Sequence, residues 1–258
     1  MINLHRMARF ARWTIVIDRP YYRMNMAIFL AVTSIALQLI NINYLTGRND
    51  TMIMALGMCA AMPIATIVFA GSYMFQSFHK YKEGIREMFM IPASNLEKFL
   101  VRYIVPTVIL FAMTIVCIFI ADLLQYLVGM IIQREPLQFV TVELWKGITG
   151  PWNLPDGTIL FVCLLSFWIH TIYLLGANFF RNVKHNWAFT SLILLLLFIV
   201  IGQIVPAFSH HPGRILISAC NEHPIPFIIG FLAVGALNIW LSFKLFCRRQ
   251  IIGRFINI

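Results

Sequence analysis

The chain has 258 residues, 60% of them hydrophobic and 12% charged, and its formal net charge is +10. A soluble domain of this size would need a more polar surface, so the composition indicates a membrane protein. It also excludes a soluble nucleic-acid-binding protein, which the positive charge alone would suggest. We therefore expect one all-α transmembrane domain over residues 1–258, with no separate soluble domain.

Residues 1–19 predict an amphipathic helix at the membrane surface. At about 100° per residue, the apolar and the basic side chains gather on opposite faces. The apolar face holds Leu4, Met7, Ala8, Ala11 and Ile15, and the polar face holds His5, Arg6, Arg9 and Arg12. We expect the helix to end near Pro20, because proline disfavours helix in the residue before it. A basic segment without fixed structure is the alternative.

Six apolar segments are each long enough to cross a bilayer. About 20 residues are needed, because a helix rises about 1.5 Å per residue and the hydrocarbon layer is about 30 Å thick. The segments are residues 24–44, 52–73, 103–128, 158–176, 188–206 and 225–246. The sequence therefore predicts six transmembrane helices.

The distribution of Lys and Arg predicts how these helices are oriented. If the N-terminus is cytoplasmic, sixteen of the 20 basic residues lie in cytoplasmic segments. The four on the opposite side are Arg48, Arg134, Lys146 and Arg214. Because cytoplasmic segments of membrane proteins carry an excess of Lys and Arg, we expect both termini in the cytoplasm. The net charge of +10 then comes mostly from basic residues beside the anionic lipids of the cytoplasmic leaflet.

The segment 76–102 is predicted to be a structured cytoplasmic loop. It mixes acidic and basic residues around an apolar cluster and then reads IPASNLEK at residues 91–98. Ser94 and Glu97 have the spacing of a capping box, in which each side chain accepts a hydrogen bond from the other residue's backbone N–H. We expect a helix to start at Asn95, with Pro92 breaking the chain before it. Two short helices with a sharp corner would result, and such a corner can dock into a cleft on a soluble partner.

The stretch IPASNLEK resembles the LPxSRxEK signature of short bacterial permeases of the type-2 ABC exporter class. Ile91 stands in place of the usual Leu, and Asn95 in place of the usual Arg. The segment GANFFRNVKHNWAFTS, at residues 176–191, is similar to a short turn of the same family. The surface helix, the six spans and the basic C-terminus also agree with the topology of this family.

The resemblance implies a permease subunit of an exporter in the bacterial inner membrane. Such a subunit pairs with a second permease copy or paralogue and with two ATP-binding cassette ATPases, which carry the ATP and Mg. The loop corner would couple the permease to the ATPase. Its coupling residues would be Glu87, Ile91, Pro92, Ala93, Ser94, Glu97 and Lys98.

The chain cannot hydrolyse ATP itself, because it has no G-x-x-x-x-G-K-[ST] phosphate-binding motif. We therefore expect no enzyme activity, cofactor or metal in this chain. The five cysteines are scattered without a CxxC pair, which favours buried small side chains over metal ligands. The cargo is not readable from the sequence, although a hydrophobic or amphipathic molecule suits the Phe- and Met-rich spans.

Polar side chains within the spans are candidates for a translocation pathway or for contacts between helices. Asp122 and Gln125 are expected near the outer headgroups, where a charge costs little. The small residues Gly57, Ala61 and Ala65 recur at four-residue steps, which favours close packing within the chain. An outer segment at residues 207–223 is expected to be partly re-entrant. The pathway candidates are Gln38, Asn41, His170, Gln203 and Asn238.

Three other functions stay open at this point. A non-transporting membrane scaffold or accessory subunit would use the same packing and the same docking loop. An intramembrane enzyme would need paired acids, G-x-S-x-G or H-E-x-x-H in the spans, and the sequence has none of these. Secondary transport is disfavoured, because the halves of the chain do not repeat and charged coupling residues are missing from the spans.

Overall fold

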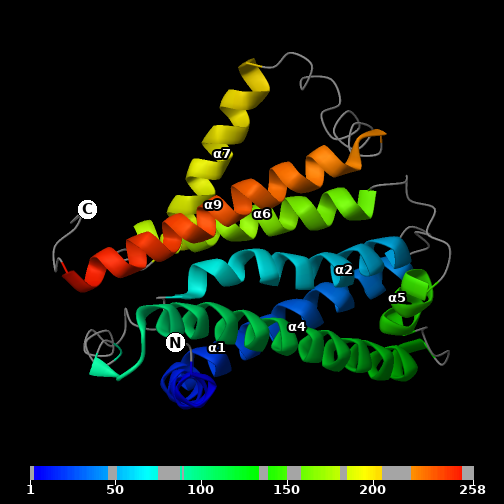
Figure 1. Cartoon of the computed structure of the whole chain (residues 1–258). Helices are drawn as coiled ribbons and strands as arrows, with labels where there is room; N and C mark the ends of the chain where they lie inside the picture. The colour runs from blue at the N-terminus through cyan, green and yellow to red at the C-terminus, as the bar shows by residue number, and fades with distance from the viewer. Residues whose placement is uncertain are drawn as a thin grey trace. The chain divides into compact units, whose positions relative to one another are not determined.

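The structure is a computed structural model that describes residues 3–45, 51–74, 88, 90–133, 139–149, 158–180, 185–204 and 222–251. Side chains are described over these ranges except at residues 40–45, 51–53, 132–133, 147–149, 158, 201–204 and 249–251. The described residues are all-helical, as predicted, and contain no strand (Figure 1). The helices are α1 (Leu4–Leu45), α2 (Thr51–Ala70), α4 (Asn95–Gln133), α5 (Val140–Thr149), α6 (Thr158–Phe179), α7 (Asn186–Ile204) and α9 (Pro224–Ile251).

Five of the described helices are long and apolar enough to cross a membrane, namely α1, α2, α4, α6 and α9. Their outward faces carry large apolar side chains, which suit contact with lipid tails. The chain is therefore a multi-pass membrane protein. The part of α7 with described side chains, Asn186–Val200, is apolar but shorter than these five helices.

The predicted end of the first helix near Pro20 is wrong, because α1 continues through it to Leu45. Proline removes one backbone hydrogen bond and disfavours helix before it, but it does not forbid helix. Packing outweighs that cost here. The buried residues recur at helical spacing on both sides of the proline, at Phe10, Thr14, Asp18, Tyr22 and Asn25.

The described chain divides into two compact units, and each has its own core. Unit 1 contains Met1–Val16, Val68–Thr107 and Leu154–Ile258. Phe99 lies at the centre of its core, with ring centroids 5.4 Å from Phe243 and 5.7 Å from Phe246. The buried members of this core are Phe10, Met74, Met88, Phe99, Val101, Leu174 and Phe246.

Two glycines let helices of unit 1 approach closely. A Cβ at Gly71 would lie 2.7 Å from the carbonyl oxygen of His170, so only glycine fits against α6 there. In Figure 1, α9 runs along α6. Within that contact, a Cβ at Gly235 would lie 2.4 Å from the ring of Phe167.

Unit 2 contains Ile17–Ile67 and Val108–Asn153. Thr66 of α2 and Thr114 of α4 share a hydrogen bond of 3.0 Å in its interior. Because each hydroxyl has one proton, one of them donates to the carbonyl four residues earlier in its own helix and accepts from the other, so these polar groups are paired among apolar neighbours. The buried core residues are Leu37, Ala55, Cys59, Ile118, Ala121 and Val140.

The predicted packing of the small residues of α2 within the chain is wrong. Gly57, Ala61 and Ala65 are all exposed, and a Cβ at Gly57 would meet no atom within 4 Å. The face of α2 that packs inward carries Ala55, Cys59 and other buried residues instead. The four-residue spacing correctly indicated a helix, but it did not identify which face of that helix is buried.

A candidate docking corner and its N-terminal latch

The chain bends at Ile91–Ala93, between Met88 and the start of α4. The backbone N–H of Ala93 donates to the carbonyl of Ile91 at 2.8 Å across Pro92. This is a three-residue turn, which the fixed φ of proline suits. The sequence therefore predicted correctly that the chain is broken at this proline.

The capping box predicted for α4 is confirmed. The N–H of Ser94 donates to Oε2 of Glu97 at 2.8 Å, and the N–H of Glu97 donates to Oγ of Ser94 at 3.3 Å. The first intrahelical bond runs from the N–H of Lys98 to the carbonyl of Ser94 at 3.0 Å. Helix α4 consequently begins at Asn95, the residue that the motif indicated.

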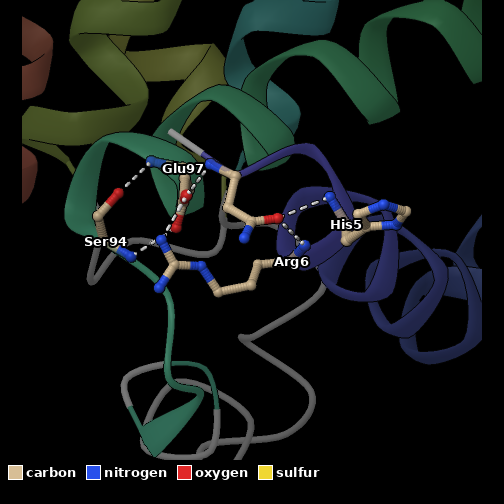
Figure 2. A network of polar contacts seen from close by, with 5 residues as sticks. His5, Arg6, Ser94 and Glu97 are labelled. Carbon is tan, nitrogen blue, oxygen red and sulfur yellow. Dashed lines mark hydrogen bonds and ion pairs between the residues drawn. The ribbon is translucent and has the colours of Figure 1, made fainter. Parts of the chain in front are cut away.

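The other carboxylate oxygen of Glu97 binds the beginning of α1. Oε1 accepts from the N–H of Asn3 at 2.7 Å and from Nη2 of Arg6 at 3.2 Å. Figure 2 shows Arg6 reaching towards Glu97 and Ser94 at the start of α4. We call this set, Asn3, Arg6, Ser94 and Glu97, the N-terminal latch. It joins two segments more than 90 residues apart in the sequence.

Asn3 also caps α1 with its own side chain. Its Oδ1 accepts from the N–H of His5 at 3.0 Å and from the N–H of Arg6 at 3.3 Å. Asparagine is among the most favoured residues at this position, because it satisfies N–H groups that have no partner within the helix. Asn3 thus connects the first turn of α1 to the first turn of α4.

Glu97 is fully enclosed, while its partner Arg6 keeps 46% of its side chain exposed. Because Glu97, Lys98 and Arg102 all lie in the first two turns of α4, Glu97 precedes the apolar part of this helix. Hydrogen bonds from the N–H groups of Asn3 and Ser94, with the charge of Arg6, lower the pKa of Glu97 to about 2. The carboxylate is therefore ionised, and both of its oxygens accept hydrogen bonds from other residues of this chain.

Arg102, five residues after Glu97, is buried as well and caps the helical turn at Gly71–Met74. Its Nε and Nη2 donate to the carbonyl of Met74 at 3.2 and 2.8 Å. A guanidinium at the C-terminal end of a helical segment pairs with carbonyls that have no partner within the segment. Arg102 is thus a structural residue of unit 1 rather than a basic residue at the membrane surface.

The predicted coupling residues divide into a buried set and an exposed set. Glu97 and Lys98 are buried, and Ile91 and Ala93 are partly buried, with Ile91 packed on the core of unit 1. Pro92 and Ser94 are exposed. Glu87 lies outside the described residues. We call the outward surface, formed by Met90, Pro92, Ser94 and Leu96, the docking corner.

The docking corner is apolar, with Met90 79% exposed and Leu96 39% exposed. The charged residues of the motif, Glu97 and Lys98, are buried, so the exposed surface is mainly apolar. Sequence reasoning had assigned the charged Glu97 and Lys98 to the contact together with the uncharged residues 91–94, and it had not included Met90 or Leu96.

The polar residues proposed for a pathway do not gather at one place among the described side chains. His170 bonds the hydroxyl of Tyr103 through Nε2 at 2.8 Å, and Nδ2 of Asn238 donates to Oγ1 of Thr171 at 3.1 Å. Both are contacts between helices of unit 1, which is one of the two roles that the sequence analysis offered for these residues. Gln38 is partly buried in unit 2. The side chains of Asn41 and Gln203 lie outside the described residues, as does segment 207–221.

Asp122 has a role that sequence reasoning missed. Its side chain is 1% exposed, so its carboxylate contacts protein and not lipid headgroups or water. Its Oδ1 accepts from the N–H of Val140 at 3.1 Å, and its Oδ2 from the N–H and the hydroxyl of Thr141 at 2.8 and 2.6 Å. Asp122 thus holds the N-terminus of α5. The contact spans 18 residues, so no local motif could have indicated it.

No protein-family model, curated protein or solved structure matches this chain.

Proposed function

We propose that this chain is the transmembrane permease subunit of an ATP-driven exporter. In the proposed assembly it pairs with a second permease and receives its energy from a separate ATP-binding cassette ATPase. The observation that carries the proposal is the docking corner, an exposed apolar turn fixed by the N-terminal latch through the buried carboxylate of Glu97. Resemblance of residues 91–98 to the family signature supports the same conclusion.

The physical reason for the proposal is rigidity. A partner that changes shape during ATP hydrolysis can move a membrane helix only through an element that does not yield. The capping box, the turn at Pro92 and the latch to Asn3 fix the corner at the beginning of α4. Because α4 has 39 residues, a force applied at its first turn is carried along a continuous helix.

The proposed topology has six spans, with both termini in the cytoplasm. Helix α7 would be the sixth span, because it buries only one stripe, with Asn186, Thr190 and Leu194. Its remaining described side chains are mostly exposed and apolar, as a lipid-surrounded helix requires. At the end of α9, Nζ of Lys244 lies 5.4 Å from the ring centroid of Trp240, a pairing that suits the cytoplasmic headgroup layer.

The test is co-purification of the tagged chain from its native membrane in mild detergent, with identification of bound proteins by mass spectrometry. We expect a stoichiometric ATP-binding cassette ATPase, and we expect Met90→Asp to remove it. Met90 is a suitable position because its exposed side chain contributes little to the core.

The matched control is Ile225→Asp, which places the same charge on a side chain that is 67% exposed at the start of α9. This variant should keep the ATPase. A preparation without any ATPase in several detergents would contradict the proposal and favour the membrane scaffold. Equal loss in both variants would contradict the assignment of the docking corner.

A further inference from the structure

Helix α5 of unit 2 is amphipathic, and its outward face carries large exposed side chains. Val140 and Leu144 pack inward on the core of the unit. Facing outward are Val142, 48% exposed, and Trp145, 67% exposed. Lys146 lies beside Trp145 with 64% of its side chain exposed, and its Nζ lies 2.5 Å from Oε1 of Glu143.

The exposed apolar surface of α4 continues to this end of the unit without a break. Beyond Asp122, the exposed residues of α4 include Leu127, Met130 and Ile131, and Ile131 is 82% exposed. Within unit 2, the exposed positions of α4 extend from Val108 to Ile131, which is about 35 Å at 1.5 Å per residue. The hydrocarbon layer is only about 30 Å thick, so one end of this surface reaches the headgroup layer.

We propose that α5 and the last turns of α4 form a membrane-surface anchor that lies at the boundary between lipid headgroups and acyl chains. Tryptophan favours this boundary, because its ring is apolar and its N–H can bond to headgroups or water. The proposal does not depend on the proposed transport function, since it needs only the membrane-spanning character of α4.

The charge of the anchor predicts which lipids it contacts. Glu143 and Lys146 form an ion pair, so these two residues add no net charge to α5. Binding then depends on apolar burial and not on attraction to anionic headgroups. This distinguishes α5 from the first turns of α1, which carry Arg6, Arg9 and Arg12.

Asp122 makes the anchor part of the unit instead of a loosely attached helix. Its carboxylate takes up the first N–H groups of α5, which fixes the direction of that helix on α4. The rings of Tyr126 and Phe139 stack beside this point with centroids 4.3 Å apart. The depth of α5 in the bilayer therefore sets the depth of α4.

The test measures Trp145 fluorescence in the full chain reconstituted into phosphatidylcholine vesicles. Subtracting the emission of Trp145→Phe from that of the unmodified chain isolates the signal of this residue among six tryptophans. Lipids brominated near the headgroup should quench that signal more strongly than lipids brominated near the bilayer centre. Replacing part of the phosphatidylcholine by phosphatidylglycerol should leave the quenching unchanged.

Two outcomes would overturn the proposal. Quenching by aqueous iodide without quenching by either brominated lipid would place α5 in water. Quenching by none of the three would place Trp145 under protein, such as a second copy of this chain. Trp240→Phe gives the matched control, because Trp240 is also half-exposed, at 53%, and lies beside Lys244.

Discussion

Helix α4 carries two buried carboxylates, and each holds the N-terminus of another helix. Glu97 accepts from the N–H of Asn3 before α1, and Asp122 accepts from the N–H groups of Val140 and Thr141 in α5. Carboxylates suit this position, because the N-terminal end of a helix has N–H groups without partners and a partial positive charge. The two sites nevertheless differ in how strongly the attached helix depends on the carboxylate.

The difference lies in whether the attached helix has a cap of its own. Helix α1 has one, since Oδ1 of Asn3 accepts from the N–H groups of His5 and Arg6. Helix α5 follows Phe139, whose side chain cannot accept a hydrogen bond. Glu97 therefore positions a helix that is already capped, whereas Asp122 supplies the only side-chain cap that the described structure gives α5.

The largest effect should follow from Asp122→Ala. This change leaves two backbone N–H groups and one hydroxyl without their acceptor, at a cost of about 3 kcal/mol. The protection factors for hydrogen exchange at Val140 and Thr141 should fall by on the order of 100-fold, because 1.4 kcal/mol corresponds to about tenfold. Mass spectrometry of the chain in lipid nanodiscs measures this directly.

Asp122→Asn is the matched variant, because its amide oxygen can still accept from one of the two N–H groups. Its protection factors should fall between those of Asp122→Ala and those of the unmodified chain. Unchanged protection in Asp122→Ala would show that α5 does not depend on this carboxylate.

Glu97→Ala should have a smaller effect at the other end of α4. It removes the latch while Asn3 still caps α1, so α1 should stay helical but separate from the first turn of α4. We expect protection at the Asn3 N–H to fall by about tenfold. Arg6→Gln, which removes only the charged partner on the exposed side, should change it less.

A loss of helix throughout the first turns of α1 in Glu97→Ala would contradict this distinction. It would mean that Glu97 caps α1 in the way that Asp122 caps α5. If Glu97→Ala and Arg6→Gln lowered the protection of the Asn3 N–H equally, the ion pair between Arg6 and Glu97 would be the interaction that holds the latch together.

Ser94→Ala tests the local half of the capping box. The variant loses one hydrogen bond of 3.3 Å, and replacing an N-cap serine costs about 1 kcal/mol. Protection at the Glu97 N–H should fall by about fivefold, while the Asn3 N–H should keep most of its protection. Release of Asn3 in this variant would show that the capping box and the latch are one cooperative unit.

These differences explain how much of the site could be predicted from the sequence. Ser94 and Glu97 are three residues apart, and a pair so close has a defined geometry once the helix forms. The start of α4 was therefore predicted correctly. The contacts of Asn3 with Glu97, and of Asp122 with Val140, depend on chain folding over long separations, so their residues carry no pattern of their own.

The fold shows the same limit. Helix type and apolar periodicity could be predicted, because they depend on neighbouring residues along the chain. The choice of buried face could not, since Gly57, Ala61 and Ala65 repeat as regularly as the residues that α2 buries. Pro20 shows that a local signal for a helix end can be outweighed when buried residues continue past it.

The smallest effect concerns pH, because protection of the Asn3 N–H should stay constant over a wide pH range. Because the pKa of Glu97 is lowered to about 2 from the ordinary 4.5, the latch contributes its full stability above pH 4.5 and loses it only as pH falls towards 2. The protection factor at Asn3 should therefore not change between pH 8 and 5. The measurement is repeated in His5→Gln, because the N–H of His5 also binds Asn3. Release of Asn3 near pH 6 in both chains would show that the Glu97 carboxylate is not held ionised, and the latch would then be a weak contact rather than a fixed support for the docking corner.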